Sequence, residues 1–194
     1  PQSYYRLGQR LERVAERPEL RFVGRERELK QIRDAIGSSL DNGQNTIIYV
    51  SGDPGIGKSR LVEEALSGIS LEAIHTAYVS CNAIIRYPLD AIKQIIRSYL
   101  GLSPQLTSEE GTAHFRSLWQ GIAAEDKEML RIESIIASLL SYEWEASVWD
   151  VLPPAEKPVQ LTGAIIYFFH RLFHSKPILI HLNDGQWLDD ESRD

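Results

Sequence analysis

The chain has 194 residues, of which 43 % are hydrophobic and 25 % are charged, and its formal net charge is −6. This composition is typical of a globular protein with enough apolar residues for one core. The acidic balance argues against general nucleic-acid binding. No apolar stretch reaches the ~18 residues of a transmembrane helix, so no membrane span is expected. The single cysteine, Cys81, fits a reducing compartment, and we expect a cytoplasmic protein.

The first apolar patterns along the chain are a helix and a strand. Leu29, Ile32 and Ile36 follow one another at steps of three and four, which predicts an amphipathic helix over residues 26–40. The β-branched apolar run at 46–50 predicts a short strand that is buried on both faces.

Beyond this strand, helical and strand patterns alternate. Strands that alternate with helices indicate an α/β fold in which helices cover a parallel sheet, a three-layer αβα arrangement. The three prolines within 151–158 predict a loop. Helices are expected at 58–69, 88–100, 107–122, 126–140 and 159–174, and further strands at 74–79 and 177–182.

A glycine-rich segment from Gly52 to Ser59 matches G-x-x-x-x-G-K-[S/T] at every defined position. Its glycines allow backbone angles that a β-carbon would forbid, so main-chain N–H groups can surround phosphate oxygens. We expect Lys58 to reach the β- and γ-phosphates and the Ser59 hydroxyl to bind Mg²⁺. The predicted nucleotide-binding residues of this segment are Gly52, Asp53, Pro54, Gly55, Ile56, Gly57, Lys58, Ser59 and Arg60.

A second motif follows the last apolar strand, where Asn183 and Asp184 stand at its carboxyl end. In a parallel sheet this end lies beside bound phosphates. We expect Asp184 to hold Mg²⁺ and orient the attacking water, and Gln186 to position that water or sense the γ-phosphate. Asn183 would join the metal site without a charge, since an amide cannot act as a base. A plain Asn-Asp-Gly turn is the alternative reading of the same residues.

Other polar residues are interpreted structurally. His170 and His174 have the one-turn spacing of a helix-borne zinc pair, but no Glu lies between them, and we predict ordinary surface or core histidines. We interpret Cys81 as a small buried hydrophobe and Arg86 as a solvated arginine. The acidic run Asp189–Glu191 is expected to be a solvated turn.

Three segments taken together resemble a known family. The segments Phe22–Leu29, Gly52–Ser59 and Ile180–Asp189 are similar to the AAA-type ATPase domain of the STAND signalling proteins, within the P-loop NTPase superfamily. Such domains occur in large bacterial transcription regulators and class III adenylate cyclases. The resemblance implies that Phe22 and Val23 lie near the adenine or its ribose, as does Arg25. It also implies ATP or ADP with Mg²⁺ as ligand, and a switch that regulates attached domains.

The sequence departs from the family pattern in two ways. The family usually has Asp or Glu where Asn183 stands, so the metal site is one charge short and hydrolysis is expected to be weakened. The family's later strand and helical lid are not found, so we expect an ATPase core cut after the strand that precedes Asp184. In this reading, residues 1–21 form a linker or entry helix, and residues 22–194 form the N-terminal part of the ATPase domain.

The leading hypothesis is an ATP-binding switch module of a larger signal-transduction protein, with slow or absent hydrolysis. Its expected partners are effector and sensor domains of the same protein, and self-association is a further expectation. The alternatives are a nucleotide-binding or degenerate interaction scaffold without hydrolysis, and a small-molecule kinase. A kinase would need an acceptor pocket with a base, and the sequence indicates none.

Overall fold

The computed structural model describes residues 24–67, 69, 74–84, 86–102, 108–123, 125–144 and 147–193. The chain forms two compact units, residues 1–70 and residues 71–194. The linker or helix expected at 1–21 lies outside the described residues. Within the described ranges, no helix has both the length and the apolar character needed to cross a bilayer.

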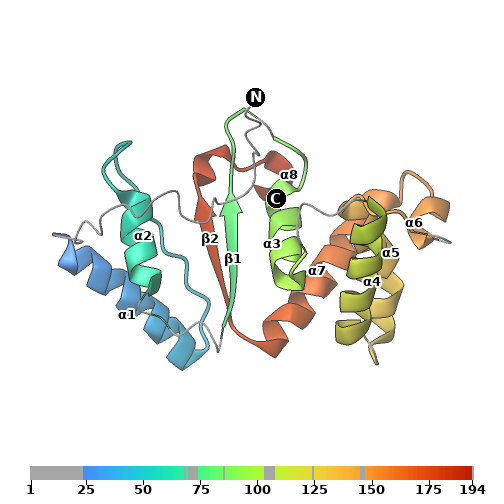
Figure 1. Cartoon of the computed structure of the whole chain (residues 1–194), viewed down its shortest axis with the longest axis horizontal. Helices are drawn as coiled ribbons and strands as arrows, with labels where there is room; N and C mark the ends of the chain where they lie inside the picture. Colours follow the sequence, from blue (N-terminus) through green and yellow to red (C-terminus); the bar gives the residue numbers. More distant parts are fainter. Residues whose placement is uncertain are drawn as a thin grey trace, which may run out of the picture. The chain divides into compact units, whose positions relative to one another are not determined.

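The first unit contains two helices, α1 (Glu26–Asn42) and α2 (Lys58–Ser67), which lie side by side (Figure 1). Both confirm helices expected from the sequence. Ile32 of α1 packs against Leu61 and Ala65 of α2, and these three residues form a small core. The spacing of the buried residues on α2 is one helical turn, so the apolar stripe of each helix faces the other.

A polar contact adds to this packing. Arg33 on α1 donates hydrogen bonds from Nη2 to the carbonyl oxygen of Glu64, at 2.7 Å, and from Nε to that of Ala65, at 3.4 Å. Both carbonyls belong to the last turn of α2, where a helix leaves carbonyl groups without intrahelical partners. A cation there also interacts favourably with the negative end of the helix dipole. Arg33 therefore anchors the carboxyl end of α2.

The prediction of a buried strand at 46–50 is wrong. Residues 44–53 form neither helix nor strand, Ile47 is 95 % exposed and Tyr49 is 88 % exposed. Only Val50 packs against the core between α1 and α2. An apolar run becomes a buried strand only where a neighbouring strand accepts its backbone hydrogen bonds. In the described part of the chain, the two strands pair with each other, and neither pairs with this segment.

The second unit is built on two parallel strands, β1 (His75–Ser80) and β2 (Ile178–Asn183), which confirm the strands expected at 74–79 and 177–182. Their register pairs His75 with Ile178 at one end and Ser80 with Asn183 at the other. Helix α3 (Asp90–Leu100) packs on β1, where its buried Ala91 and Ile95 meet Ala77 and Val79. The parallel sheet is therefore confirmed, with two strands among the described residues.

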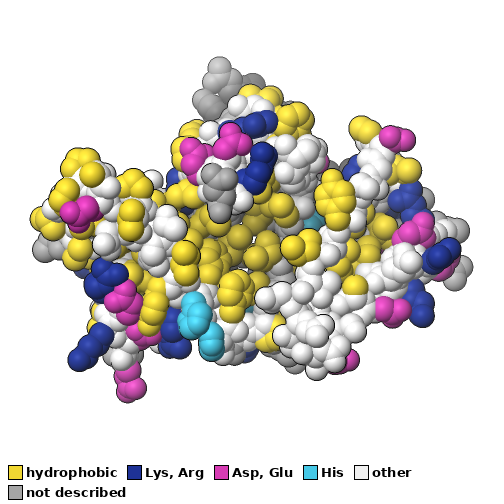
Figure 2. All heavy atoms as spheres, turned by 180° about the vertical axis from the view of Figure 1, so that it is seen from behind, with side chains coloured by type: hydrophobic (Ala, Val, Ile, Leu, Met, Phe, Trp, Pro, Cys, Tyr) yellow, Lys and Arg dark blue, Asp and Glu magenta, His cyan; other side chains and the backbone are white. Residues whose placement is uncertain are grey.

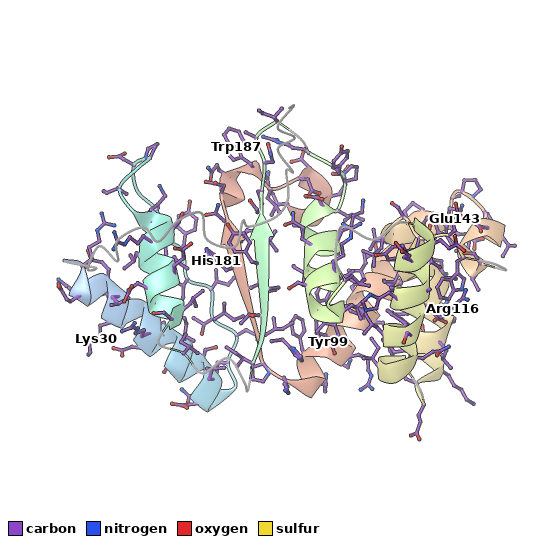
Figure 3. All side chains as sticks on the ribbon, viewed as in Figure 1. Lys30, Tyr99, Arg116, Glu143, His181 and Trp187 are labelled. Atoms are coloured by element: carbon purple, nitrogen blue, oxygen red, sulfur yellow. The ribbon has the colours of Figure 1, made fainter. Side chains whose placement is uncertain are left out.

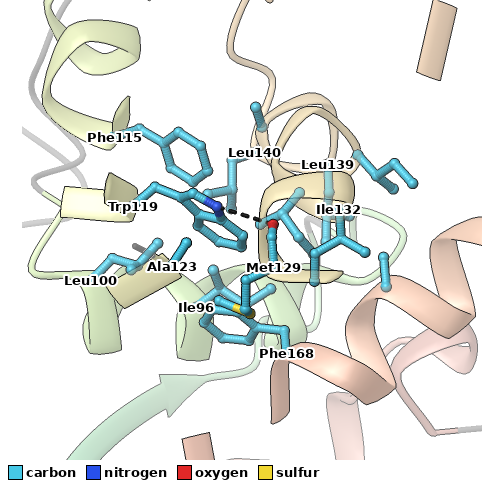
Figure 4. Packing of buried hydrophobic residues seen from close by; sticks show 14 of the residues in the cluster. Ile96, Leu100, Phe115, Trp119, Ala123, Met129, Ile132, Leu139, Leu140 and Phe168 are labelled. Carbon is cyan, nitrogen blue, oxygen red and sulfur yellow. Dashed lines mark hydrogen bonds between the residues drawn. The ribbon is translucent and has the colours of Figure 1, made fainter. Parts of the chain in front are cut away.

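Four more helices surround the larger core of this unit: α4 (Ser108–Ala123), α5 (Lys127–Leu139), α6 (Val148–Val151) and α7 (Lys157–Ser175). The centre of this core is Trp119, stacked between Phe115 and Phe168 at ring-centroid distances of 5.2 and 5.8 Å (Figure 4). Its indole Nε1 donates a hydrogen bond to the carbonyl oxygen of Met129, at 3.2 Å. The only polar atom of the buried ring is thus satisfied.

One carboxylate fixes the start of α5. Asp126 accepts hydrogen bonds from the backbone N–H groups of Glu128 and Met129, both at 3.1 Å, and so caps the helix. The hydroxyl of Tyr167 donates to the same carboxylate at 2.9 Å, and Arg171 forms an ion pair with it at 2.8 Å. Both partners lie on α7, so Asp126 links the start of one helix to the middle of another.

The remaining differences from the sequence prediction are element ends and short elements. Helix α6 was not expected, and α6 and α7 take up the two ends of the loop expected at 151–158. Helix α7 starts at Lys157 and takes Pro158 into its first turn, where a proline costs no helical hydrogen bond. Two short elements follow β2, a 3₁₀ turn η2 (Gly185–Trp187) and helix α8 (Asp190–Arg193). Of the acidic run Asp189–Glu191, Asp190 and Glu191 therefore lie in α8, and Asp189 directly precedes this helix.

We predict that Phe168→Ala strongly destabilises the protein. The side chain is fully buried against Trp119 and Tyr99, and its removal leaves a cavity. The expected loss is about 3–5 kcal/mol of unfolding free energy, measured by urea denaturation. The matched control is Ile166→Ala on the same helix, where the side chain is 64 % exposed and the expected change is within about 0.5 kcal/mol. Equal losses in both variants would contradict this description of the core.

Candidate nucleotide-binding site

The loop from Gly52 to Gly57 leads directly into α2. Gly55 has φ +78° and Gly57 has φ +90°, conformations that residues with a β-carbon rarely adopt. No other atom lies within 4 Å of a β-carbon built at either position, so backbone conformation and not crowding selects glycine there. Among the described residues, the backbone hydrogen bonds of this loop include a long one from the N–H of Ile56 to the carbonyl of Asp53, at 3.4 Å, and one from the N–H of Leu61 to the carbonyl of Gly57, at 3.0 Å.

Lys58 lies at the first position of α2, and its ammonium bends back over the loop. Nζ donates to the carbonyl oxygens of Gly52, at 2.9 Å, and of Asp53, at 3.0 Å. The side chain is thereby held at the N-terminal end of the helix, where the helix dipole and the first N–H groups attract anions. Backbone amides together with one ammonium are a donor set for phosphate oxygens. The residues present therefore fit a polyphosphate.

Of the residues expected near the adenine, the structure describes Arg25, which lies just before α1. Phe22 and Val23 fall outside the described residues. Arg25 precedes α1 with a left-handed backbone, φ +62°, and its carbonyl accepts the N–H of Leu29 at 2.9 Å. The turn before it is held by a hydrogen bond from the N–H of Gly24 to Glu26 Oε1, at 3.1 Å. The role of Arg25 in adenine binding stays a prediction.

In the second unit, Asp184 follows β2 in a left-handed conformation, φ +55°. Its carboxylate accepts one hydrogen bond on each oxygen, from Asn183 Nδ2 at 3.1 Å and from Gln186 Nε2 at 3.2 Å. Three of the four side chains expected to hold metal and water are thus brought together at the carboxyl end of one strand. The fourth, Ser59, belongs to the first unit, in the first turn of α2. Two amides fix the carboxylate, and its remaining lone pairs are exposed. Their roles in metal binding and catalysis stay predictions.

Asp189 contradicts the expectation of a solvated acidic turn, because only 7 % of it is exposed. One carboxylate oxygen accepts the backbone N–H groups of Leu89 and Ser192, each at 2.9 Å. Burial raises the pKa of Asp189, but hydrogen bonds from Ser192 and Leu89 outweigh it and hold the pKa below its usual value. The carboxylate ties the start of α3 to the start of α8, while its neighbours Asp190 and Glu191 are exposed as expected.

The surroundings of Asp189 also include an arginine and a thiol. The guanidinium of Arg86 lies over the ring of Trp187, 5.3 Å from the centroid, beyond the carboxyl end of β2 (Figure 3). Arg86 is exposed, as expected from the sequence, and this cation–π contact orients its guanidinium. Cys81 is half-buried, and burial, followed by the charges of Asp189 and other carboxylates, raises the pKa of its thiol. It therefore stays protonated and is a poor nucleophile.

Sequence reasoning missed two residues that position the site. Arg33 anchors α2, and Asp189 anchors the segment that follows Asp184. The partners of Asp189 lie 3 and 100 residues away. The hydrogen bond from the N–H of Ser192 is the contact of a helix N-cap, and an Asp just before a helical segment is a sequence signal for it. The long-range one has no local signal.

A comparison with protein families identifies the chain. The model of the AAA ATPase domain matches residues 21–194, which include both the glycine-rich loop and the Asp184 strand. The chain therefore belongs to the AAA ATPase domain family. Membership indicates a nucleotide-binding protein of the P-loop NTPase type, with ATP as the expected ligand. Searches of curated proteins and of solved structures find no match.

We predict that Asp189→Asn destabilises the protein by about 1–3 kcal/mol at neutral pH, because the amide cannot replace a charged acceptor of two N–H groups. The folded pKa is lowered, so the carboxylate stabilises the fold above its unfolded pKa of about 3.9, and this stabilisation is lost as the pH falls through the folded pKa. The stability gap between wild type and variant should close below about pH 4.

The measurement is the unfolding free energy of both proteins between neutral and acidic pH. Asp190→Asn serves as the control, since Asp190 makes only an exposed ion pair with Arg193 at 3.5 Å. A gap of constant size down to strongly acidic pH would show that the Asp189 charge is not what holds α3 to α8.

Proposed function

We propose that the chain binds ATP or ADP through residues 52–60 and acts as a regulatory switch module of a larger signalling protein. The observation that carries the proposal is the loop itself. Two glycines with positive φ and the ammonium of Lys58 stand at the N-terminus of α2. The donors of this loop are complementary to a polyphosphate and have no use in packing, since residues 51–57 are exposed.

In the proposed function, Lys58 leaves the carbonyls of Gly52 and Asp53 and binds the β- and γ-phosphates. The loop amides bind the same anion, and Arg60 follows on the first turn of α2. Phe22, Val23 and Arg25 are proposed to contact the adenine or its ribose. These assignments rest on the family and on the positions of the residues in the sequence.

Mg²⁺ is the proposed second component. Ser59, Asn183 and Asp184 are the residues that would hold it, since hydroxyl, amide and carboxylate oxygens suit this hard cation. When bound, Mg²⁺ would neutralise charge on the β- and γ-phosphates. Asp184 keeps exposed lone pairs on both oxygens beside its two amide donors, which supports a role in accepting a metal-bound water or orienting an attacking one.

Asn183 supports a switch with weak hydrolysis. Its side chain donates to Asp184, and it brings neither a negative charge nor a base. Turnover then depends on Asp184 alone, with Gln186 as a neutral group that positions water. A bound nucleotide that is hydrolysed slowly holds one conformational state for a long time. The proposed partners are effector and sensor domains of the same protein, with self-association as a further possibility, in the cytoplasm.

The same residue favours a second candidate, a scaffold that binds nucleotide without hydrolysis. A site with one carboxylate where two are usual binds the cation less strongly. The two candidates share the phosphate loop and differ only in turnover, so one kinetic measurement separates them.

We predict that Lys58→Ala weakens Mg-ATP binding by at least about 100-fold, because it removes the charge-assisted contact to the phosphates. Isothermal titration calorimetry measures the affinity. Lys30→Ala is the matched control: Lys30 is an exposed lysine of the same unit, labelled in Figure 3, and it pairs only with Asp34 on its own helix. Unchanged affinity of the Lys58 variant would refute nucleotide binding at this loop.

We also predict that Asn183→Asp raises steady-state ATP turnover by roughly tenfold or more, since it restores a carboxylate to the metal site. Asp184→Asn in the Asn183→Asp background should abolish the gain. Phosphate release measured with each variant tests this. If Asn183→Asp turns over ATP no faster than the wild type, the missing charge does not limit hydrolysis.

A further inference from the structure

Two histidines lie side by side on the exposed face of α7. His170 and His174 are one helical turn apart, both are exposed, and their ring centroids are 4.3 Å apart with an angle of 42° between the planes. Histidine side chains are visible at the molecular surface in Figure 2. Phe168 and Leu172 lie on the opposite face of the same helix and are buried in the core. Their packing fixes the rotation of α7 about its axis, which leaves the face with the two histidines exposed. Neither histidine has a part in the proposed nucleotide site.

The tautomer of His174 is set by a hydrogen bond. Its Nδ1 lies 2.7 Å from the carbonyl oxygen of His170, and a carbonyl can only accept. Nδ1 therefore carries the proton in the neutral ring, and Nε2 keeps its lone pair. A ring N–H donated to a backbone carbonyl is the arrangement that orients metal-binding histidines in proteins and raises their basicity.

The electrostatic surroundings also admit a cation. His174 stands in the last turn of α7, whose carbonyl groups give that end of the helix a partial negative charge. Arg171 lies next to His170 in the sequence, but its charge is compensated by the ion pair with Asp126 at 2.8 Å. The nearest cations in sequence on the other side are Lys176 and, further off, Arg193, and no contact of either with the histidines is found among the described residues.

We propose that His170 and His174 form a binding site for one divalent transition-metal ion such as Zn²⁺ or Ni²⁺. Two imidazoles at positions i and i+4 of a helix can reach the same ion, and imidazole suits these metals. The described residues include no group of three or more His, Cys, Asp and Glu side chains that could hold a metal ion, so the site has two protein ligands. Water therefore completes the coordination sphere, and the site is independent of the nucleotide.

The test is a titration of the whole chain with ZnCl₂, and in parallel with NiCl₂, followed by calorimetry. The expected result is saturable binding of one ion per chain, with an affinity at least about tenfold weaker in His170→Ala and in His174→Ala. His114→Ala is the matched control, because His114 is an exposed helical histidine with Glu110 and Leu118 one turn away. It should bind as the wild type does.

A second readout separates loss of ligands from loss of fold. Excess Zn²⁺ should raise the Tm of the wild type and of His114→Ala, because an ion that binds only the folded state stabilises it. It should leave the Tm of the two α7 variants unchanged, while their circular dichroism stays that of the wild type. No saturable uptake by the wild type would overturn the proposal, as would equal affinity and equal Tm shift in all variants.

Discussion

The in-register parallel pairing of β1 with β2 is the constraint on which the second unit depends. It places the carboxyl ends of both strands, Ser80 and Asn183, next to each other at one end of the sheet, although about a hundred residues separate them in the sequence. The segments that follow the two strands must then meet, and a buried carboxylate at Asp189 joins them through the N–H of Leu89. The positions of Asp184 and Gln186 follow from the same pairing, since they continue β2 beyond that end.

The longer helices of the described residues could be predicted from sequence because their signals are local, whereas the four-residue helices α6 and α8 were not expected. Apolar residues at steps of three and four define α1 and α5, and Asp126 caps α5 as its position suggests. The glycine-rich loop belongs to the same category, because G-x-x-x-x-G-K-S specifies backbone conformation and charge within eight residues. The helix after this loop and the positive φ of its glycines agree with that prediction.

Features that depend on distant partners could not be predicted. The run at 46–50 has the residues of a buried strand, but composition does not tell whether a neighbouring strand is there to pair with it. Asp189 belongs to an acidic run whose composition predicts a solvated turn. Its hydrogen bond from the N–H of Leu89 depends on the tertiary fold, which the local sequence does not indicate. The stacking of Arg86 on Trp187 is equally non-local. The metal and catalytic roles of Asn183 and Asp184 follow from their place at the carboxyl end of a parallel strand, and they stay predictions.

In the proposed function, phosphate binding by Lys58 is an exchange of hydrogen-bond partners and not a simple addition. The Lys58 ammonium already donates hydrogen bonds to two main-chain carbonyl oxygens, so a polyphosphate must replace these acceptors in order to bind it. The affinity for the nucleotide then depends on the difference between the Lys58–phosphate contacts and the Lys58–carbonyl contacts. It is lower than the phosphate contacts alone would give. Arg33 holds the opposite end of α2 through the carbonyls of Glu64 and Ala65, away from the lysine that would change partners. In the proposed function, two backbone carbonyls of the loop therefore compete with the phosphates for the Lys58 ammonium.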